Sequence, residues 1–179
     1  MTGARFTPAD GTSAGLDLEI GFLADHLEAR DFHAQWFTTD WGDPGDPAAI
    51  EARRRVLPER ANRDRLPICL VGLLGDEPVA AATLKFREIE FADDADHWLG
   101  SVYVREDVRG RGYGRAIVGA TADLAATRGF VPLYLYTRDK RGLCERLGWR
   151  VVGAPAVDGR PATVMALSPG RVNRNREAE

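Results

Sequence analysis

The segment Val104–Gly114, V-R-E-D-V-R-G-R-G-Y-G, decides the fold of this chain, because it predicts a strand end, a glycine-rich turn and the start of a helix. Glycine has no Cβ, so Gly110, Gly112 and Gly114 allow a tight turn whose successive N–H groups point into one concavity. The helix that begins near Tyr113 adds unpaired amides and the positive end of its dipole. The segment therefore predicts a pyrophosphate-binding turn. Three arginines supply charge-assisted donors at its rim, namely Arg109, Arg111 and Arg115.

The spacing of these glycines excludes two common phosphate-binding motifs. A P-loop requires Gly-Lys-Ser/Thr at the end of the turn, and a dinucleotide-binding fold requires G-x-G-x-x-G early in a βαβ unit, with an acidic residue after the second strand. Here the pattern is G-x-G-x-G in the second half of the chain. Only one more strand, a short helix and a hairpin are expected after the helix.

The turn and its flanks resemble the GNAT acetyltransferase superfamily. Its signature, Arg/Gln-x-x-Gly-x-Gly/Ala, is matched by Arg109, Gly112 and Gly114. Residues 99–104 resemble the strand before the turn, and residues 133–137 the strand after the helix. The sequence L-C-E-R-L-G-W at residues 143–149 resembles the closing helix of the family. The resemblance implies an α/β fold with a mixed, largely antiparallel central sheet of six to seven strands, flanked by helices.

Length, charge and cysteine content are compatible with one such domain. A chain of 179 residues with 44% hydrophobic residues can bury a single substantial core, which we expect over residues 1–168 with a disordered polar tail at 169–179. The net charge of -3 argues against a nucleic-acid partner. Cys69 and Cys144 define no disulfide framework and no zinc spacing, so we expect no metal and a reducing cytoplasmic location. No apolar run predicts a signal peptide or a membrane segment.

Periodicity and turn residues predict the remaining elements. Asp17 is expected to cap a first helix with Ile20, Leu23 and Leu27 on one face. Residues 40–47 are expected to form a loop, with Asp46 and Pro47 starting a second helix toward Leu57. A hairpin is expected next, with strands at 68–74 and 79–89 and a four-residue turn at 75–78. It is followed by a strand at 98–104, a helix at 113–128, a strand at 133–137 and a short helix at 140–147. A last hairpin has strands at 150–153 and 162–167 and turns near 158–159.

The resemblance also implies how acetyl-CoA binds. Its pantetheine arm would hydrogen-bond the main chain of the strand that ends at Val104, so Val102, Tyr103 and Val104 are expected cofactor contacts. In the family a bulge in this strand, and its splaying from the neighbouring strand, open a slot where an N–H polarises the thioester carbonyl. Thr137 either hydrogen-bonds the pantetheine or caps the next helix.

The reaction implied is direct attack of an amine on the acetyl carbonyl, which requires a base because a free alkylamine has a pKa near ~10.4. Counting back from Val104, the position of the family's base is Trp98, which cannot act as one. Glu88, Glu90 and His97 are the candidates nearby. The two glutamates could instead be solvated carboxylates at the edge of a strand, and the histidine could be a surface residue without a catalytic role.

The residue that donates a proton to the leaving thiolate in the family is also replaced in this sequence. The family usually has a tyrosine at the position of Cys144, and a thiol is a shorter and weaker hydrogen-bonding group. Cys144 either donates the proton or packs the helix. In the second case Tyr134, Tyr136 or solvent would supply the proton.

The acceptor is expected to be a primary amine of a small molecule or peptide. Trp36, Phe37 and Trp41 either line its pocket or belong to the core. The acidic residues 93–96 either attract a cationic amine or only increase solubility. The resulting hypothesis is an acetyl-CoA-dependent N-acetyltransferase acting through a ternary complex. The sequence is compatible with a homodimer. The alternative is a non-catalytic acyl-CoA-binding regulatory module, and only turnover separates the two.

Overall fold

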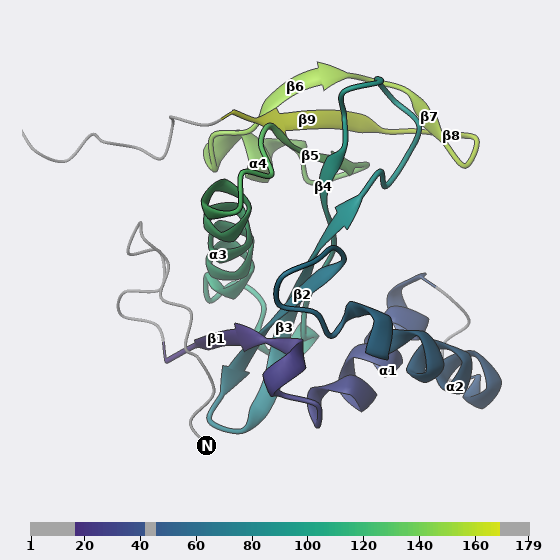
Figure 1. Cartoon of the computed structure of the whole chain (residues 1–179), viewed down its shortest axis with the longest axis vertical. Helices are drawn as coiled ribbons and strands as arrows, with labels where there is room; N and C mark the ends of the chain where they lie inside the picture. The colour runs from purple at the N-terminus through teal and green to yellow at the C-terminus, as the bar shows by residue number, and fades with distance from the viewer. Residues whose placement is uncertain (1–16, 42–45, 169–179) are drawn as a thin grey trace, which may run out of the picture.

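The computed structural model describes residues 17–41 and 46–168 and contains a seven-stranded sheet in the order β1-β2-β3-β4-β5-β9-β6 (Figure 1). Its strands are β1 (Glu19–Phe22), β2 (Ile68–Leu74), β3 (Glu77–Phe86), β4 (His97–Val104), β5 (Leu133–Thr137), β9 (Thr163–Leu167) and β6 (Arg150–Gly153). Only β4 and β5 pair in parallel; the other neighbours are antiparallel. This confirms the mixed, largely antiparallel sheet expected from the sequence.

Helices cover both faces of the sheet. They are α1 (Ala29–Trp41), α2 (Pro47–Val56), α3 (Tyr113–Thr127) and the short α4 (Arg141–Arg146), together with the 3-10 turns η1 (Leu23–Asp25), η2 (Leu57–Arg60) and η3 (Glu106–Val108). Figure 1 shows α3 on one face, and α1 with α2 on the opposite face. The predicted cap of α2 is confirmed, because the Asp46 side chain accepts a hydrogen bond from the Ala48 N–H at 2.9 Å.

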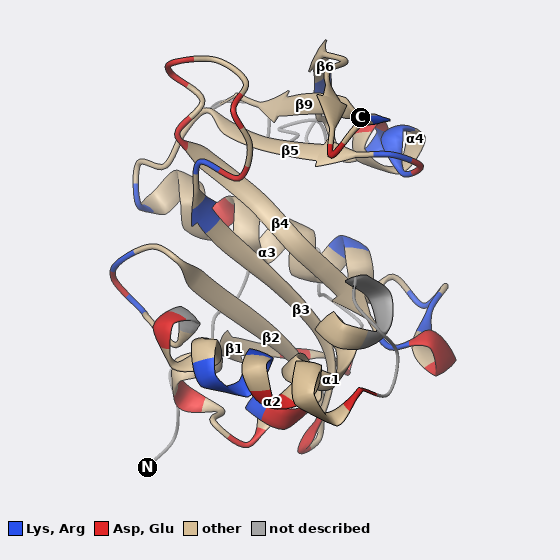
Figure 2. Ribbon diagram, turned by 90° about the vertical axis from the view of Figure 1, so that its right-hand side faces the viewer, with Lys and Arg blue, Asp and Glu red and all other residues tan. Residues whose placement is uncertain are grey.

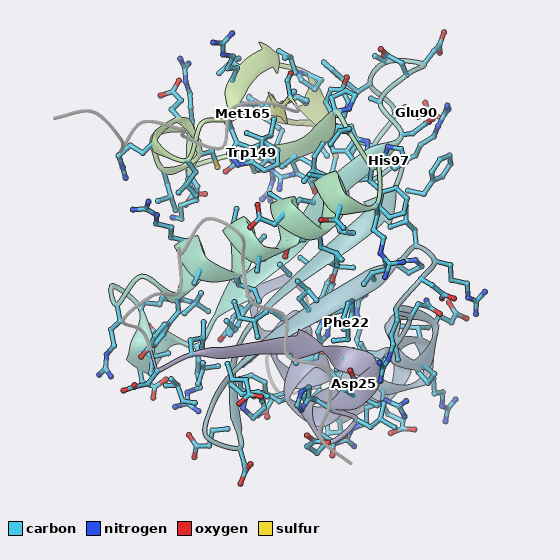
Figure 3. All side chains as sticks on the ribbon, turned by 60° about the vertical axis from the view of Figure 1, so that its left-hand side comes forward. Phe22, Asp25, Glu90, His97, Trp149 and Met165 are labelled. Atoms are coloured by element: carbon cyan, nitrogen blue, oxygen red, sulfur yellow. The ribbon has the colours of Figure 1, made fainter. Side chains whose placement is uncertain are left out.

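The main core lies between α3 and the sheet. Ile117, Thr121, Leu124 and Ala125 of α3 are buried, as the helical spacing predicted. The helix ends before Gly129, whose φ of +74° suits a residue without a Cβ. Figure 3 shows Trp149 and Met165, both buried in this core, close together beside α3.

The expected first helix near residue 17 is wrong, since this segment forms the edge strand β1. Leu18, Ile20 and Phe22 are buried at every second position, which is the period of a strand with one covered face. β1 pairs with β2, and α1 begins only at Ala29. The helical spacing of Ile20, Leu23 and Leu27 was coincidental, and Leu27 is exposed.

Other boundaries differ from the prediction by a few residues. The turn between β2 and β3 contains two residues rather than four, because Glu77 already pairs with Leu74. β3 ends at Phe86 rather than at residue 89, since Arg87 has a φ of +44° and donates its N–H to the Asp96 carbonyl. α1 continues through Trp41 into the expected loop, of which residues 42–45 lie outside the described part of the chain.

The end of the chain matches the prediction closely. β6 and β9 form the expected hairpin, and its turn is completed by a small ladder of β7 (Ala156–Val157) and β8 (Arg160–Pro161) around residues 158–159. Residues 169–179, the expected polar tail, lie outside the described part of the chain.

Candidate active site

The glycine turn joins η3 to the N-terminus of α3. Gly110 and Gly112 have φ values of +79° and +88°, in the left-handed region that favours glycine. Gly112 is the N-cap residue of α3, and its carbonyl accepts the N–H of Ala116 at 3.0 Å. The amides of residues 113–115 therefore precede the hydrogen-bond ladder of the helix. This geometry leaves a group of N–H donors at the positive end of a 15-residue helix.

Two arginines fix the turn against β4. The Arg109 Nε donates to the Val104 carbonyl at 2.9 Å, and its guanidinium lies 5.6 Å from the centre of the Tyr103 ring. Arg105 bridges Asp107 at 2.6 Å and Glu77 at 3.1 Å, and the hydrogen bond from Arg105 lowers the pKa of Asp107. Arg111 and Arg115 are exposed at the rim. The role of Arg105 gives no signal in the sequence, because its partner Glu77 is 28 residues away.

β4 contains a bulge opposite β3. Ala81 pairs with Tyr103 but Thr83 pairs with Gly100, so β4 has one residue more than β3 between these pairs. Ser101, inside the bulge, has a φ of +51°. The bulge also reverses the alternation of side chains, since Leu99 and then Val102 both contact the core under α3. The resemblance implied a bulge at this place.

β4 and β5 separate beyond their first residues. They pair only at His97 with Leu133 and at Trp98 with Tyr134. Figure 2 shows the two strands together at one end and apart at the other. The edge of β4 that β5 leaves unpaired, called the gap below, begins after Trp98 and includes the bulge, which agrees with the splaying that the resemblance implied.

The free edge of β4 presents main-chain groups to this gap. The Arg105 N–H donates to the Val79 carbonyl of β3 at 2.8 Å, so Arg105 and, two residues earlier, Tyr103 direct their main chain toward β3. Val102 and Val104 therefore direct theirs to the opposite edge, where the Val104 carbonyl accepts the side chain of Arg109. Tyr103 was also expected to contact the cofactor through its main chain, but its main-chain N–H and C=O point toward β3.

Polar side chains surround the bulge on the face opposite α3. The Thr83 hydroxyl and the Ser101 hydroxyl are buried and have no hydrogen-bond partner among residues 17–41 and 46–168. Lys85 and Glu88 form an ion pair at 2.6 Å beside Gly100. Buried polar groups without partners are rare in folded proteins, so these hydroxyls indicate a place for a ligand.

Comparison with known proteins agrees with this geometry. Residues 26–149 match the sequence model of the acetyltransferase (GNAT) family. The chain belongs to this family. It is therefore an acyltransferase, and the GNAT fold accounts for the bulge, the gap and the glycine turn together. No curated protein matches the chain in sequence.

Solved structures share the fold. An aminoglycoside 6'-acetyltransferase type Ii is 19% identical, with a TM-score of 0.64 over 83% of this chain and 96% of that chain. An aminoglycoside 6'-N-acetyltransferase complexed with coenzyme A is 17% identical, with a TM-score of 0.61 over 78% and 89%. The ribosomal-protein-S18-alanine N-acetyltransferase from Escherichia coli is 19% identical, with a TM-score of 0.58 over 89% and 98%.

The candidate bases lie on different sides of the sheet. His97 stacks on Phe130 at 4.9 Å and faces the α3 side, whereas Glu88 lies over Gly100 on the other face. Glu90 is exposed, and Figure 3 shows it at the same end of the molecule as His97, far from Phe22 and Asp25. Trp98, at the position where the family carries its base, is fully buried and donates its Nε1–H to the Ala95 carbonyl at 2.6 Å. Glu88 Oε2 would lie 3.1 Å from a Cβ on Gly100, the residue directly before the bulge.

Cys144 and Tyr136 differ in their surroundings. Cys144 is buried in the core that contains Leu135 and Trp149, and burial raises the pKa of its thiol. Tyr136 is half-buried on the face of Trp98 and Tyr134, two residues beyond the last pairing of β5 with β4. Burial, and then the charge of Glu88, raise the pKa of Tyr136. Tyr136 thus lies on the part of β5 that does not pair with β4.

Thr137 has a hydrogen-bond partner within the chain. Its Oγ1 accepts the N–H of Lys140 at 3.0 Å, directly before α4. This contact closes the turn that leads into α4, but the N-cap residue of the helix is Lys140 and it makes no side-chain cap hydrogen bond. The contact therefore decides for neither of the two expected roles of Thr137. The described residues contain no group of three or more His, Cys, Asp or Glu side chains that could hold a metal ion.

The aromatic residues of α1 are part of the fold around the site. Trp36 is buried and stacks on Tyr103 with ring centres 4.2 Å apart, so it joins α1 to β4. Phe37 is half-buried beneath the guanidinium of Arg53, 4.1 Å from its ring centre. Trp41 ends α1, and its side chain lies outside the described part of the structure. No helix formed by residues 17–41 and 46–168 has the length and apolar character to cross a membrane.

Proposed function

We propose that the protein transfers the acetyl group of acetyl-CoA to a primary amine of a small molecule or peptide, by direct attack in a ternary complex. The bulge of β4 carries this proposal. The bulge lies where β4 has lost its pairing with β5, and β4 then runs on to the glycine turn at the N-terminus of α3. The main chain at this unpaired edge would polarise the thioester carbonyl.

The residues of the turn and of β4 fit acetyl-CoA. The amides of residues 110–115 would hold its diphosphate, with Arg111 and Arg115 at the rim. The main chain of Val102 and Val104, directed into the gap, would hydrogen-bond the pantetheine as an added strand does. Acetyl-CoA supplies a thioester, whose carbonyl carbon is the electrophile.

Glu88 is proposed as the base that frees the acceptor amine. An alkylamine with a pKa near ~10.4 is almost fully protonated at neutral pH and must lose a proton before it attacks. The Glu88 carboxylate lies against Gly100, next to the bulge, and it is partly buried. General base catalysis of this kind contributes about 10²- to 10⁴-fold in rate.

Tyr136 is proposed as the proton donor to the leaving thiolate. A phenol with an ordinary pKa of about 10 is protonated at neutral pH, and Tyr136 lies on β5 two residues beyond the last pairing with β4, where the thioester would lie. Cys144, at the position where the family usually has a tyrosine, is proposed to pack the core. The chain thus retains a phenol near the reaction, supplied by β5 instead of α4.

The acceptor is proposed to be cationic. The loop between β3 and β4 is acidic, and Arg87 neutralises only Asp96 in it, through a bond of 2.8 Å. Asp93 and Asp94 are exposed, and burial, followed by the charge of Asp94, raises the pKa of Tyr134. This acidic loop joins the end of β3 to the start of β4, and Figure 2 shows it next to β5. Aminoglycosides, polyamines and peptide amino termini all have the required charge.

The test is incubation with acetyl-CoA and a panel of amines, read by release of free CoA thiol. We expect release above the hydrolysis background with at least one cationic amine, and its loss in Glu88→Gln. Binding of CoA without release for any amine would instead support the non-catalytic acyl-CoA-binding module.

A further inference from the structure

Lys85 is one of two lysines in the chain, the other being Lys140. The two have very different surroundings. The side chains of Lys85 and its partner Glu88 are 16% and 18% exposed, whereas that of Lys140 is 64% exposed and pairs with the adjacent Asp139. A partly buried lysine therefore lies in the proposed active site of an enzyme that acts on amines.

The position of Lys85 follows from the register of β3. Leu84 pairs with Leu99, and both face the α3 core, so Lys85 points to the opposite face together with Thr83 and Gly100. A Cβ built on Gly100 would lie 3.1 Å from the Lys85 Nζ and 3.1 Å from Glu88 Oε2. The amine thus lies directly over the residue that precedes the bulge, where the proposed function would place an acceptor amine.

The base that this amine needs is already in contact with it. The Nζ lies 2.6 Å from Glu88 Oε2 and 2.7 Å from Oε1. Lys85 and Glu88 therefore reproduce, within the chain, the pair formed by an acceptor ammonium and its base. Gly100 leaves room for this pair, because a Cβ at that position would make both groups shift by a few tenths of an ångström.

We propose that Lys85 is itself an acceptor and is acetylated at Nζ by the molecule that carries it, an inference that rests on the proposed function. One proton of the ammonium passes to Glu88, and the freed lone pair forms the Nζ–C bond. The thioester C–S bond breaks and its electron pair leaves with sulfur. As the amide forms, Nζ loses its second proton to solvent, the thiolate takes up a proton from Tyr136 or solvent, and free CoA is the second product.

Acetylation of Lys85 changes the site for other acceptors. The amide that forms has no charge and cannot hold Glu88 in an ion pair. The Glu88 carboxylate then becomes available to the ammonium group of an incoming amine. Lys85 acts in this scheme as an internal acceptor whose modification prepares the base.

The experiment incubates the full chain with acetyl-CoA carrying an isotopically labelled acetyl group and follows both lysine-containing peptides by mass spectrometry. We expect label on Lys85 at a rate that saturates with acetyl-CoA and does not change when the protein concentration is varied tenfold. Lys140 serves as the internal control and should remain essentially unlabelled. Glu88→Gln should slow the labelling about 10²-fold or more.

Several results would overturn the proposal. Equal labelling of Lys85 and Lys140, a fractional rate that rises with protein concentration, or full labelling of Glu88→Gln would each indicate chemical or intermolecular acetylation. Turnover of the amine panel with Lys85 unlabelled would refute self-acetylation and leave the proposed function intact. Absence of both label and turnover, with CoA bound, would refute the two proposals together.

Discussion

The electrostatic character of the glycine turn can be tested at Gly110, because the position tolerates side chains that differ only in charge. A Cβ added there meets no atom within 4 Å, and its φ of +79° is one that Asn and Asp adopt more readily than other residues. Gly110→Asn and Gly110→Asp have nearly the same shape. The difference between them therefore isolates the effect of one negative charge at the turn.

The expected magnitude follows from Coulomb's law. A carboxylate about 6 Å from one phosphate charge is repelled by about 0.7 kcal/mol at the dielectric constant of water and by about 2.8 kcal/mol at an effective value of about 20. The Asp variant should thus bind CoA between about 3-fold and 100-fold more weakly than the Asn variant. Added salt should narrow the difference, because it screens exposed charges.

The assay is calorimetric titration with CoA, with the same pair of substitutions at Gly129 as the control. Gly129 also has a positive φ, +74°, and open space around it, but it lies at the other end of α3. Unfolding of the Gly110 variants must be measured in parallel. An acidic residue near the N-terminus of a helix is favourable, so the Asp variant should be no less stable than the Asn variant. Equal CoA affinity of Gly110→Asn and Gly110→Asp would refute the assignment of a phosphate to this turn.

Three further predictions concern the reacting groups. Glu88→Gln should lower kcat/KM for amines about 10²-fold or more, whereas Glu90→Gln, in an exposed residue, should leave it nearly unchanged; equal losses would remove Glu88 as the base. Tyr136→Phe should lower kcat without weakening CoA binding, and Tyr134→Phe should not, as steady-state kinetics and CoA titration will show; unchanged kcat in Tyr136→Phe would return the proton donor to Cys144 or solvent. Burial raises the pKa of the Cys144 thiol, so the stability that it provides is complete below the ordinary thiol pKa of about 8.5 and is lost as the pH rises. Denaturant unfolding of Cys144→Ala should therefore show a smaller loss of stability between neutral and alkaline pH than the wild type, with CoA affinity retained; a large loss of turnover in this variant would show instead that the thiol takes part in the reaction.

Local chemistry explains which elements were predictable. The turn before α3 was predicted from the glycines that its left-handed φ values require, and the ends of α2 and α3 from Asp46 and Gly129. The segment 17–27 was not predicted, since a few apolar residues fit two periodicities when the strand partner is unknown. Pairing of β1 with β2 decided between them.

The arrangement of the candidate site is set by the pairing register of β3 with β4, which the sequence pattern does not reveal. The bulge was expected only from the family resemblance, because no residue type in β4 requires a φ of +51° at Ser101. Lys85 gave no signal in the sequence. Its role emerges only when the pairing of β3 with β4 places it beside Gly100.

Amide hydrogen exchange with and without CoA tests the central claim most directly. The account predicts that saturating CoA slows exchange of the amides of residues 110–115 and of Val102 and Val104, while the amides of the hairpin between β2 and β3 keep their rates. Unchanged exchange at the turn and at the β4 edge, with CoA demonstrably bound, would contradict it.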